Sequence, residues 1–166
     1  RELTEENPDT YLPDLAGSCN DLAGLLYDTG SFKEAEELHR ESLKIRRELA
    51  EKNPDAYLPD LAISCNNLAI LLRNTGSFKE AEELHREALK IRRELAEKSP
   101  DAYLPELAMS CNNLATLLYN TGSFKEAEEL LQESLKIRRE LSEKYPDAYL
   151  PDLAFSCNNL ADLLCD

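Results

Sequence analysis

The chain repeats its own sequence every 46 residues. Near-copies occupy residues 7–52, 53–98 and 99–144, and residues 145–166 begin a fourth copy. Self-similarity at a fixed period of this size is typical of solenoids, in which each unit buries its apolar face only by stacking on its neighbours. The sequence therefore predicts one array over residues 1–166, with residues 1–6 as the stub of a preceding unit. Both ends lie inside a unit, so we expect a fragment of a longer protein. A repeat presents the same groups at regular intervals, which favours binding over catalysis.

The charge balance is strongly acidic. The chain carries 33 Asp and Glu against 19 Lys and Arg, a net charge of −14, which repels phosphate backbones instead of neutralising them. We therefore expect no nucleic-acid partner. The surplus acids are mixed with Lys and Arg along helical segments, which is typical of a solvated outer face; attraction of a basic partner is the alternative. No apolar run approaches the roughly 18 residues of a membrane span, and no basic-then-apolar leader precedes the array. We expect a soluble protein without a membrane partner.

The cysteines follow the repeat. One lies at the same position of every copy, at Cys19, Cys65, Cys111 and Cys157, and Cys165 is the only extra one. Neighbouring units stack about a helix diameter apart, roughly 10 Å, which exceeds the roughly 7 Å limit between the Cα atoms of a disulfide. We therefore expect buried free thiols, without a disulfide or a metal site. Free thiols in odd number fit a reducing environment and predict a cytoplasmic protein.

The second copy is typical of a helix pair. In the first helix, called the A helix, an apolar stripe with intervals of four, three and four residues consists of Leu61, Cys65, Leu68 and Leu72. Pro59 suits the first turn of a helix, where its missing N–H needs no partner. We therefore expect a turn over residues 54–57 and an A helix from about Leu58 to Asn74. The alternative is a start at Asn53-Pro54, with Pro59 inside the helix as a kink.

A second helix, called the B helix, follows after a tight turn. Gly76 ends the A helix, because glycine adopts the left-handed conformation after a helix without steric cost. Ser77 and Glu80 have the spacing of a capping box, which predicts a B helix that runs to about Lys98. Its apolar stripe consists of Ala81, Leu84, Ala88, Ile91 and Leu95. Pairs of opposite charge lie four residues apart on its solvent side, Glu82 with Arg86 and Arg93 with Glu97. The predicted fold class is all-α, an α-solenoid of antiparallel helix pairs.

These residues resemble the tetratricopeptide repeat (TPR) family. The matching residues are Asn67-Leu68-Ala69, Leu72, Gly76, Ala81, Ala88 and Leu89. Cys65, His85 and Arg93 stand where the family has Trp, Phe and a closing Pro, and the loss of that Pro lets the B helix continue. The long period resembles that of kinesin light chains and many bacterial arrays, through Asn66-Asn67-Leu68-Ala69 and Ala88-Leu89-Lys90-Ile91-Arg92. The resemblance implies a right-handed superhelix whose A helices line the concave wall.

The copies differ from one another mainly on one face of the A helix. Among the 14 positions from Leu61 to Asn74, five change residue type in the first three copies, against four among the 22 positions from Ser77 to Lys98. At 100° per residue those five lie within an arc of about 120°, opposite the apolar stripe. The TPR resemblance places this arc in the groove, where exposed apolar side chains mark an interaction site. Packing against the next A helix and drift after duplication are the alternatives.

We predict a partner-binding surface from these variable positions and the Asn residues beside them. Its residues are Gly17, Asn20, Asp21, Gly24, Tyr27, Ile63, Asn66, Asn67, Ile70, Arg73, Asn74, Met109, Asn112, Asn113, Thr116, Tyr119, Asn120, Phe155, Asn158, Asn159 and Asp162. One Asn is constant in all four copies, at Asn20, Asn66, Asn112 and Asn158. A side-chain amide pairs with both the N–H and the C=O of an extended peptide, and kinesin light chains are similar in using groove Asn residues in this way. Bridging between neighbouring A helices is the alternative.

Nothing in the sequence favours an enzyme. His39 and His85 are the only histidines, and the third copy has Leu131 at the same position, which indicates packing. No Gly-rich phosphate loop and no nucleophile with a base at helical spacing occurs. We predict a non-catalytic module, without a cofactor, that binds a protein or peptide; a structural spacer or self-assembling segment is the alternative. End-to-end self-association would use apolar residues of the last A helix, Leu160, Leu163 and Leu164.

Overall fold

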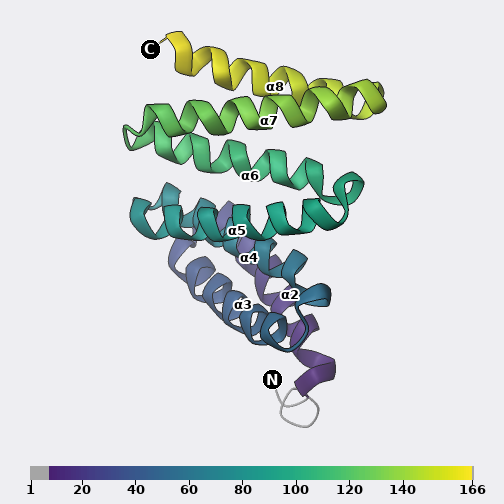
Figure 1. Cartoon of the computed structure of the whole chain (residues 1–166). Coiled ribbons are helices and arrows are strands. Elements are labelled where there is room, and N and C mark those ends of the chain that lie inside the picture. The colour runs from purple at the N-terminus through teal and green to yellow at the C-terminus, as the bar shows by residue number, and fades with distance from the viewer. Residues whose placement is uncertain (1–7, 166) are drawn as a thin grey trace. The chain divides into compact units, whose positions relative to one another are not determined.

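The computed structural model describes residues 8–165, and it describes the side chains of all of these except residues 8, 9, 155, 159 and 162–165. This part of the chain consists of helices and turns, without a strand (Figure 1). The A helices are α2 (Pro8–Asp28), α4 (Pro54–Asn74), α6 (Pro100–Asn120) and α8 (Pro146–Cys165). The B helices are α3 (Phe32–Lys52), α5 (Phe78–Lys98) and α7 (Phe124–Lys144). The predicted helix pair is therefore confirmed in each of the three complete copies.

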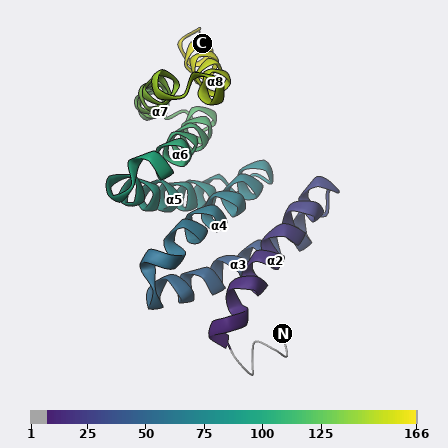
Figure 2. The ribbon, with the colours of Figure 1, turned by 90° about the vertical axis from the view of Figure 1, so that its right-hand side faces the viewer.

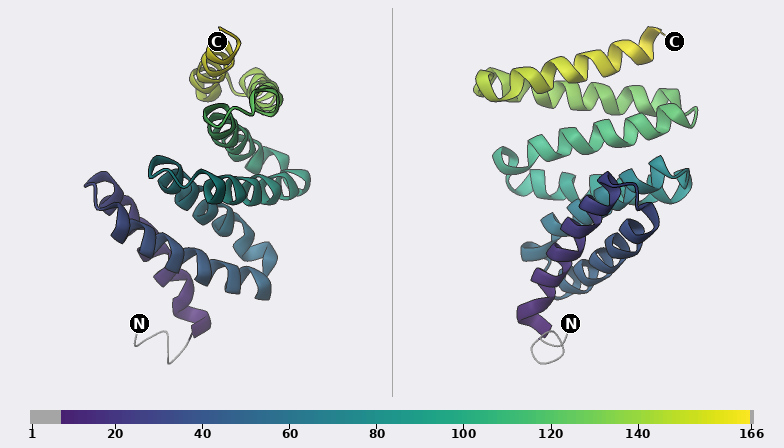
Figure 3. Two further views of the ribbon diagram at one scale, coloured as in Figure 1. Left: turned by 90° about the vertical axis from the view of Figure 1, so that its left-hand side faces the viewer. Right: turned by 180° about the vertical axis from the view of Figure 1, so that it is seen from behind.

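The chain divides into two compact units, Arg1–Leu84 and His85–Asp166, with the division inside α5. In the first unit α2 packs on α3, and α3 packs on α4. Figure 2 shows α2 and α3 as one antiparallel hairpin. In the second unit α6 packs on α7 and α7 on α8, and Figure 3 shows these three helices side by side. Within its own unit, α3 thus packs against both α2 and α4, and α7 packs against both α6 and α8.

Glycine forms the turn between the two helices of each hairpin, as predicted. Gly76 has a φ of 90°, and its equivalents Gly30 and Gly122 have φ of 81° and 87°. This left-handed conformation favours glycine because any other side chain meets the backbone there. The turn closes with two backbone hydrogen bonds, from Gly76 N to Arg73 O at 3.2 Å and from Ser77 N to Leu72 O at 2.8 Å.

The A helices begin earlier than expected. The helix α4 starts at Pro54 and contains Pro59, so the favoured start at Leu58 is wrong and the alternative start is correct. Asn53 is the N-cap residue, and Pro54 occupies the first turn, where its missing N–H has no partner in any helix. Pro59 lies in the second turn, where its lack of an N–H leaves only the carbonyl four residues earlier, on exposed Asp55, without a helical bond.

The capping box predicted at Ser77 and Glu80 is absent at the two equivalent positions whose cap geometry is described. Ser31 and Ser123 are the N-cap residues of α3 and α7, and neither side chain makes a capping hydrogen bond. The backbone of Ser31 has a φ of −82° and a ψ of 59°. Its backbone carbonyl, not its hydroxyl, accepts a hydrogen bond from the helix, since Ala35 N donates to Ser31 O at 3.0 Å. The helices α3 and α7 therefore start without a side-chain cap.

The cores combine leucine and alanine with the repeated cysteine. Cys19, Cys65 and Cys111 are buried free thiols, which confirms the interpretation for these three, whereas Cys157 is exposed. The largest described core, in the second unit, joins α6 and α7 and includes Leu114, Leu118, Leu130, Leu131 and Leu141. Leu160 of α8 packs against this core. The side chains of Leu163, Leu164 and Cys165 lie outside the described residues.

Buried polar groups join one helix to the next at constant sequence spacing. Arg46 of α3 donates to the carbonyl of Asp60 in α4 at 2.7 Å. Its equivalent Arg138 donates to the carbonyl of Asp152 at 2.6 Å. Arg92 donates to the carbonyl of Glu106 at 2.9 Å. All three arginines are buried. Each of them satisfies a backbone carbonyl 14 residues later and so fixes a B helix against the following A helix.

Candidate functional site

The positions at which the copies differ reach the surface of the A helices. Ile63 is 40% exposed and Met109 is 39% exposed, whereas Leu68 and Leu114 on the opposite stripe of the same helices are completely buried. Both exposed residues are large and apolar, and both occupy the position of Gly17 in the first copy. We call the exposed and half-buried members of the predicted set, on each unit separately, the variable A-helix face.

The predicted site residues divide into three groups by exposure. Exposed residues are Asp21, Ile63, Asn74, Met109, Thr116, Asn120 and Asn158. Half-buried residues are Gly17, Asn20, Gly24, Tyr27, Asn67, Ile70, Arg73, Asn113 and Tyr119. Buried residues are Asn66 and Asn112. The side chains of Phe155, Asn159 and Asp162 lie outside the described residues.

Two of the four constant Asn residues, Asn66 and Asn112, lie deeper than the Asn residues that follow them. Asn66 is 5% exposed and Asn112 is 3% exposed. Asn112 Nδ2 donates to Ser156 Oγ at 3.3 Å, which joins α6 to α8 inside the second unit. This contact matches the bridging alternative, because the amide is used between two A helices. Asn20 is half-buried and also bridges, since Asn67 Nδ2 donates to Asn20 Oδ1 at 3.1 Å.

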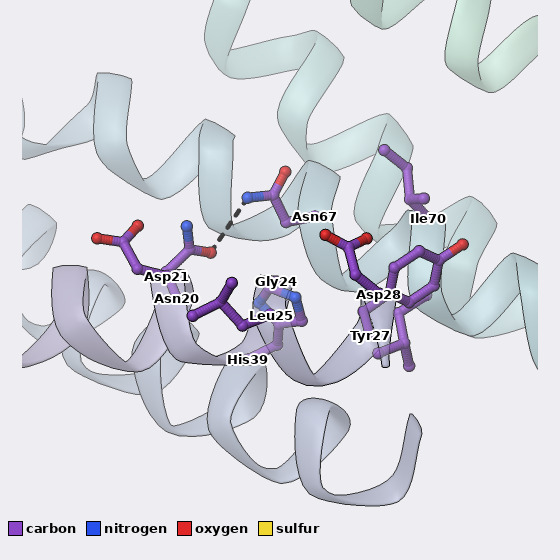
Figure 4. Close-up of a pocket in the computed structure, with 10 residues that line it drawn as sticks. Asn20, Asp21, Gly24, Leu25, Tyr27, Asp28, His39, Asn67 and Ile70 are labelled. Carbon is purple, nitrogen blue, oxygen red and sulfur yellow. Dashed lines mark hydrogen bonds between the residues drawn. The ribbon is translucent and has the colours of Figure 1, made fainter. Parts of the chain in front are cut away.

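The first unit contains a pocket of about 590 Å³, which we call the α2–α4 pocket. Figure 4 shows it from the side of α2, with the Asn20–Asn67 hydrogen bond at one end and Tyr27 and Ile70 at the other. Its lining residues are Asn20, Asp21, Gly24, Leu25, Tyr27, Asp28, His39, Asn67, Ile70 and Leu71. Six of these belonged to the predicted surface, so the structure brings one part of that surface together in a concave site.

His39 of α3 also lines the pocket, behind Gly24 of α2 (Figure 4). Its side chain is 4% exposed, and its Nδ1 atom has no hydrogen-bond partner in the structure. Burial lowers the pKa of His39 below its ordinary value, so the ring is neutral at neutral pH. The sequence predicted packing for this residue, and its burial confirms that. The sequence did not predict that His39 lines the pocket. The residue lies on the B helix, and it contacts the pocket only where Gly24 has no side chain.

Asp21 and Asp28 supply the charge of the pocket. Their equivalents in the second copy are Asn67, which donates to Asn20, and Asn74, which donates to the hydroxyl of Tyr27. Asn donates and accepts, whereas an ionised Asp only accepts. No Lys or Arg is among the residues that line the pocket. The site is thus rich in acceptors and poor in donors.

Two other kinds of site are absent from the described part of the chain. No group of three or more His, Cys, Asp or Glu side chains, among those that the structure describes, is placed to hold a metal ion. None of the helices described there combines the length and the apolar character that a membrane crossing requires.

Helix hairpins in tandem, with a core of leucine and alanine and a glycine turn, are typical of α-solenoid repeat proteins. Sequence models of the tetratricopeptide repeat match residues 14–94 and residues 107–147. The chain therefore belongs to the tetratricopeptide repeat family. Curated protein sequences gave no match.

Solved structures agree with this assignment. The crystal structure of BtubC (BKLC) from P. vanneervenii is 26% identical over 90% of this chain, with a TM-score of 0.73. Two structures from Podosopora anserina, of a kinesin light chain with nearly identical TPR-like repeats, are each 24% identical, over 92% and 86% of this chain. Their TM-scores are 0.71 and 0.61. This chain spans 55%, 66% and 65% of the lengths of those three solved chains.

Proposed function

We propose that the chain is a non-catalytic module that binds an extended segment of a partner protein on the variable A-helix face. Tetratricopeptide repeats act as protein-interaction or scaffold modules and are generally non-catalytic. The net charge of −14 supports a protein partner over a nucleic acid. The buried free thiols support a reducing, cytoplasmic location.

One observation carries this proposal. The described residues that differ between copies on the A helices are exposed or half-buried, and two of the exposed ones, Ile63 and Met109, are large and apolar. Leaving apolar surface in water costs about 25 cal/mol per Å² relative to burial. The core leucines are retained in all three complete copies, whereas these exposed positions carry Gly, Ile and Met. Such a distribution supports a surface that is selected for contacts with another molecule.

Random peptide display against the chain tests the proposal. Peptides selected on the wild type are measured by titration against Ile63→Ser and Met109→Ser. We expect each variant to weaken the peptides that contact it by at least about tenfold, because a buried aliphatic anchor contributes roughly 1.5–3 kcal/mol. Phe78→Ser is the matched control, since Phe78 is 44% exposed but lies on a B helix. Failure to select any peptide, or selected peptides that bind all four proteins equally, would contradict the proposal.

A specific observation favours a second candidate, a self-assembling array. Leu22 and Leu25 of α2 are 48% and 65% exposed, whereas their equivalents Leu68 and Leu71 are at most 1% exposed. Leu71 is buried against Ala23 and Ala35 of the preceding hairpin. A further hairpin of the same class would cover Leu22 and Leu25 in the same way. Leu25→Glu should abolish any concentration-dependent association in sedimentation velocity.

A further inference from the structure

The α2–α4 pocket exists because a side chain is missing from α2. Nothing lies within 4 Å of a Cβ atom added to Gly24, so packing does not require glycine there. The equivalent residues Ile70 and Thr116 have side chains. Glycine inside a helix is less stable than alanine, so the chain keeps an unfavourable residue that opens a pocket. Through this opening the imidazole of His39 becomes part of the lining.

The same copy differs from the others in charge. Asp21 and Asp28 replace the amides that the second copy has at Asn67 and Asn74. Both carboxylates line the pocket, and Figure 4 shows them at its two ends, with Gly24 and Leu25 between them. Seven residues of helix separate them by about 10.5 Å. One side chain entering at Gly24 therefore has a carboxylate within reach on either side.

His39 adds an independent indication that the pocket takes a ligand. The ring is almost completely buried, yet Nδ1 has no partner. Buried polar atoms without a partner are rare, and each one needs an explanation. With its proton on Nε2, the neutral ring presents Nδ1 as an acceptor. Nδ1 of His39 and the carboxylates of Asp21 and Asp28 are all hydrogen-bond acceptors. Together they favour a ligand that donates hydrogen bonds.

We propose that the α2–α4 pocket binds a lysine or arginine side chain of the partner segment. This inference rests on the proposed function. It places a preference for a basic side chain of the partner in the first copy of the repeat. The aliphatic stem of such a side chain would lie against Leu25 and Ile70, as long cationic side chains do on apolar surfaces. The cationic head would donate to Asp21 or Asp28, beside the buried ring of His39. An acidic or phosphorylated segment would be repelled at this position.

NMR titration with Nα-acetyl-arginine amide tests the inference directly. We expect saturable amide shifts confined to residues 20–28 and to Asn67 and Ile70, with a dissociation constant on the order of millimolar. The neutral isostere Nα-acetyl-citrulline amide should bind at least fivefold more weakly. Raising the salt concentration should weaken the arginine probe and leave the citrulline probe nearly unchanged, because exposed charges are screened.

Three variants make the test specific. The double variant Asp21→Asn with Asp28→Asn should bind the arginine probe at least fivefold more weakly, and it should fold, because the second and third copies carry Asn at both positions. Gly24→Ile, which copies Ile70, should abolish the shifts by filling the pocket. The control Glu37→Gln with Glu48→Gln removes two exposed charges elsewhere and should leave the affinity within twofold.

Several outcomes would overturn the inference. These are equal binding of the two probes, indifference to the Asp substitutions, or shifts at residues 20–28 that arise from self-association without any probe. Peptide display separates this inference from the proposed function. Selected peptides that depend on Ile63 but carry no basic preference would leave the proposed function standing and remove the pocket assignment. Arginine binding in the pocket without any selected peptide would support the pocket assignment and contradict the proposed function.

Discussion

Arg40 and Glu80 are forty residues apart in sequence and form a two-pronged ion pair between α3 and α5. Arg40 Nη1 donates to Glu80 Oε1 at 2.5 Å, and Nη2 donates to Oε2 at 2.9 Å. Arg86 and Glu126 repeat the arrangement one copy later, with the same two distances. The sequence predicted pairs within a helix, and Arg40 does also contact Glu36 four residues earlier. Residue spacing along one helix could not predict these ion pairs between successive B helices.

The Arg40–Glu80 pair should contribute modestly to stability. Both side chains are more than one third exposed, and exposed pairs contribute about 0.2–1 kcal/mol. We expect a coupling energy in this range from a double-mutant cycle of Arg40→Ala and Glu80→Ala in urea unfolding, reduced at high salt. The hydrogen bond from Arg40 lowers the pKa of Glu80 below its ordinary value of 4.5. The coupling is therefore complete above that value and disappears as the pH falls through the lower folded pKa. A coupling that is unchanged by acid and by salt would contradict this account.

Gly17 and Gly24 should be replaceable with a gain in stability. Added Cβ atoms meet nothing within 4 Å at either position, and alanine is favoured over glycine in a helix by about 1 kcal/mol. We expect Gly17→Ala and Gly24→Ala each to raise the free energy of unfolding by up to about that amount. Gly76→Ala is the control and should lower it, because φ is 90° there. Thermal unfolding followed by circular dichroism at 222 nm measures all three.

The cysteines should differ sharply in reactivity. Burial, reinforced by the nearby Glu133 carboxylate, raises the pKa of the Cys111 thiol to about 12. The thiolate is the reactive form, so this residue should be inert at neutral pH. In a Cys165→Ser background we expect one fast-reacting thiol, the exposed Cys157, and slow reaction at the three buried ones. Timed labelling with a chromogenic disulfide reagent, with and without denaturant, measures this. Fast labelling of Cys111 in the folded protein would refute it.

His39→Leu should stabilise the chain and flatten its pH dependence. The buried Nδ1 atom has no partner, and an unsatisfied buried polar group costs about 1–3 kcal/mol. Leu131 shows that leucine fits the equivalent position. Burial lowers the pKa of His39 below 6.5, so the unfolded chain binds more protons as the pH falls below that value, and the wild type loses stability there. The leucine variant should lack this loss. Urea unfolding above and below pH 6.5 compares the two slopes, and identical slopes would show that His39 does not titrate on unfolding.

The sequence predicted those features that depend on local periodicity. The hairpins, the turn at Gly76 and the end of α4 at Asn74 all follow from side-chain spacing and from the conformational freedom of glycine. The start of α4 was missed because Pro59 is compatible with either the first or the second turn, and α4 begins at Pro54, directly after the N-cap residue Asn53.

The candidate site was predictable only in part. Variation between copies identified Asp21 and Gly24, since both lie on the arc that changes. It did not identify His39, which belongs to a different helix and enters the pocket only through tertiary packing. Nor did it distinguish half-buried from buried amides, since Asn67 is half-buried and its neighbour Asn66 is buried.

The buried arginines have a consequence for how such a chain can change in length. Arg46, Arg92 and Arg138 each bond a carbonyl 14 residues later, so every contact is defined relative to the period and not to the chain ends. Unequal recombination between equivalent codons adds or removes 46 residues and preserves all of these contacts, whereas an out-of-phase insertion between Arg92 and Glu106 separates a buried guanidinium from its acceptor. Duplication in phase is thus the route by which the gene can gain new variable positions without new core packing.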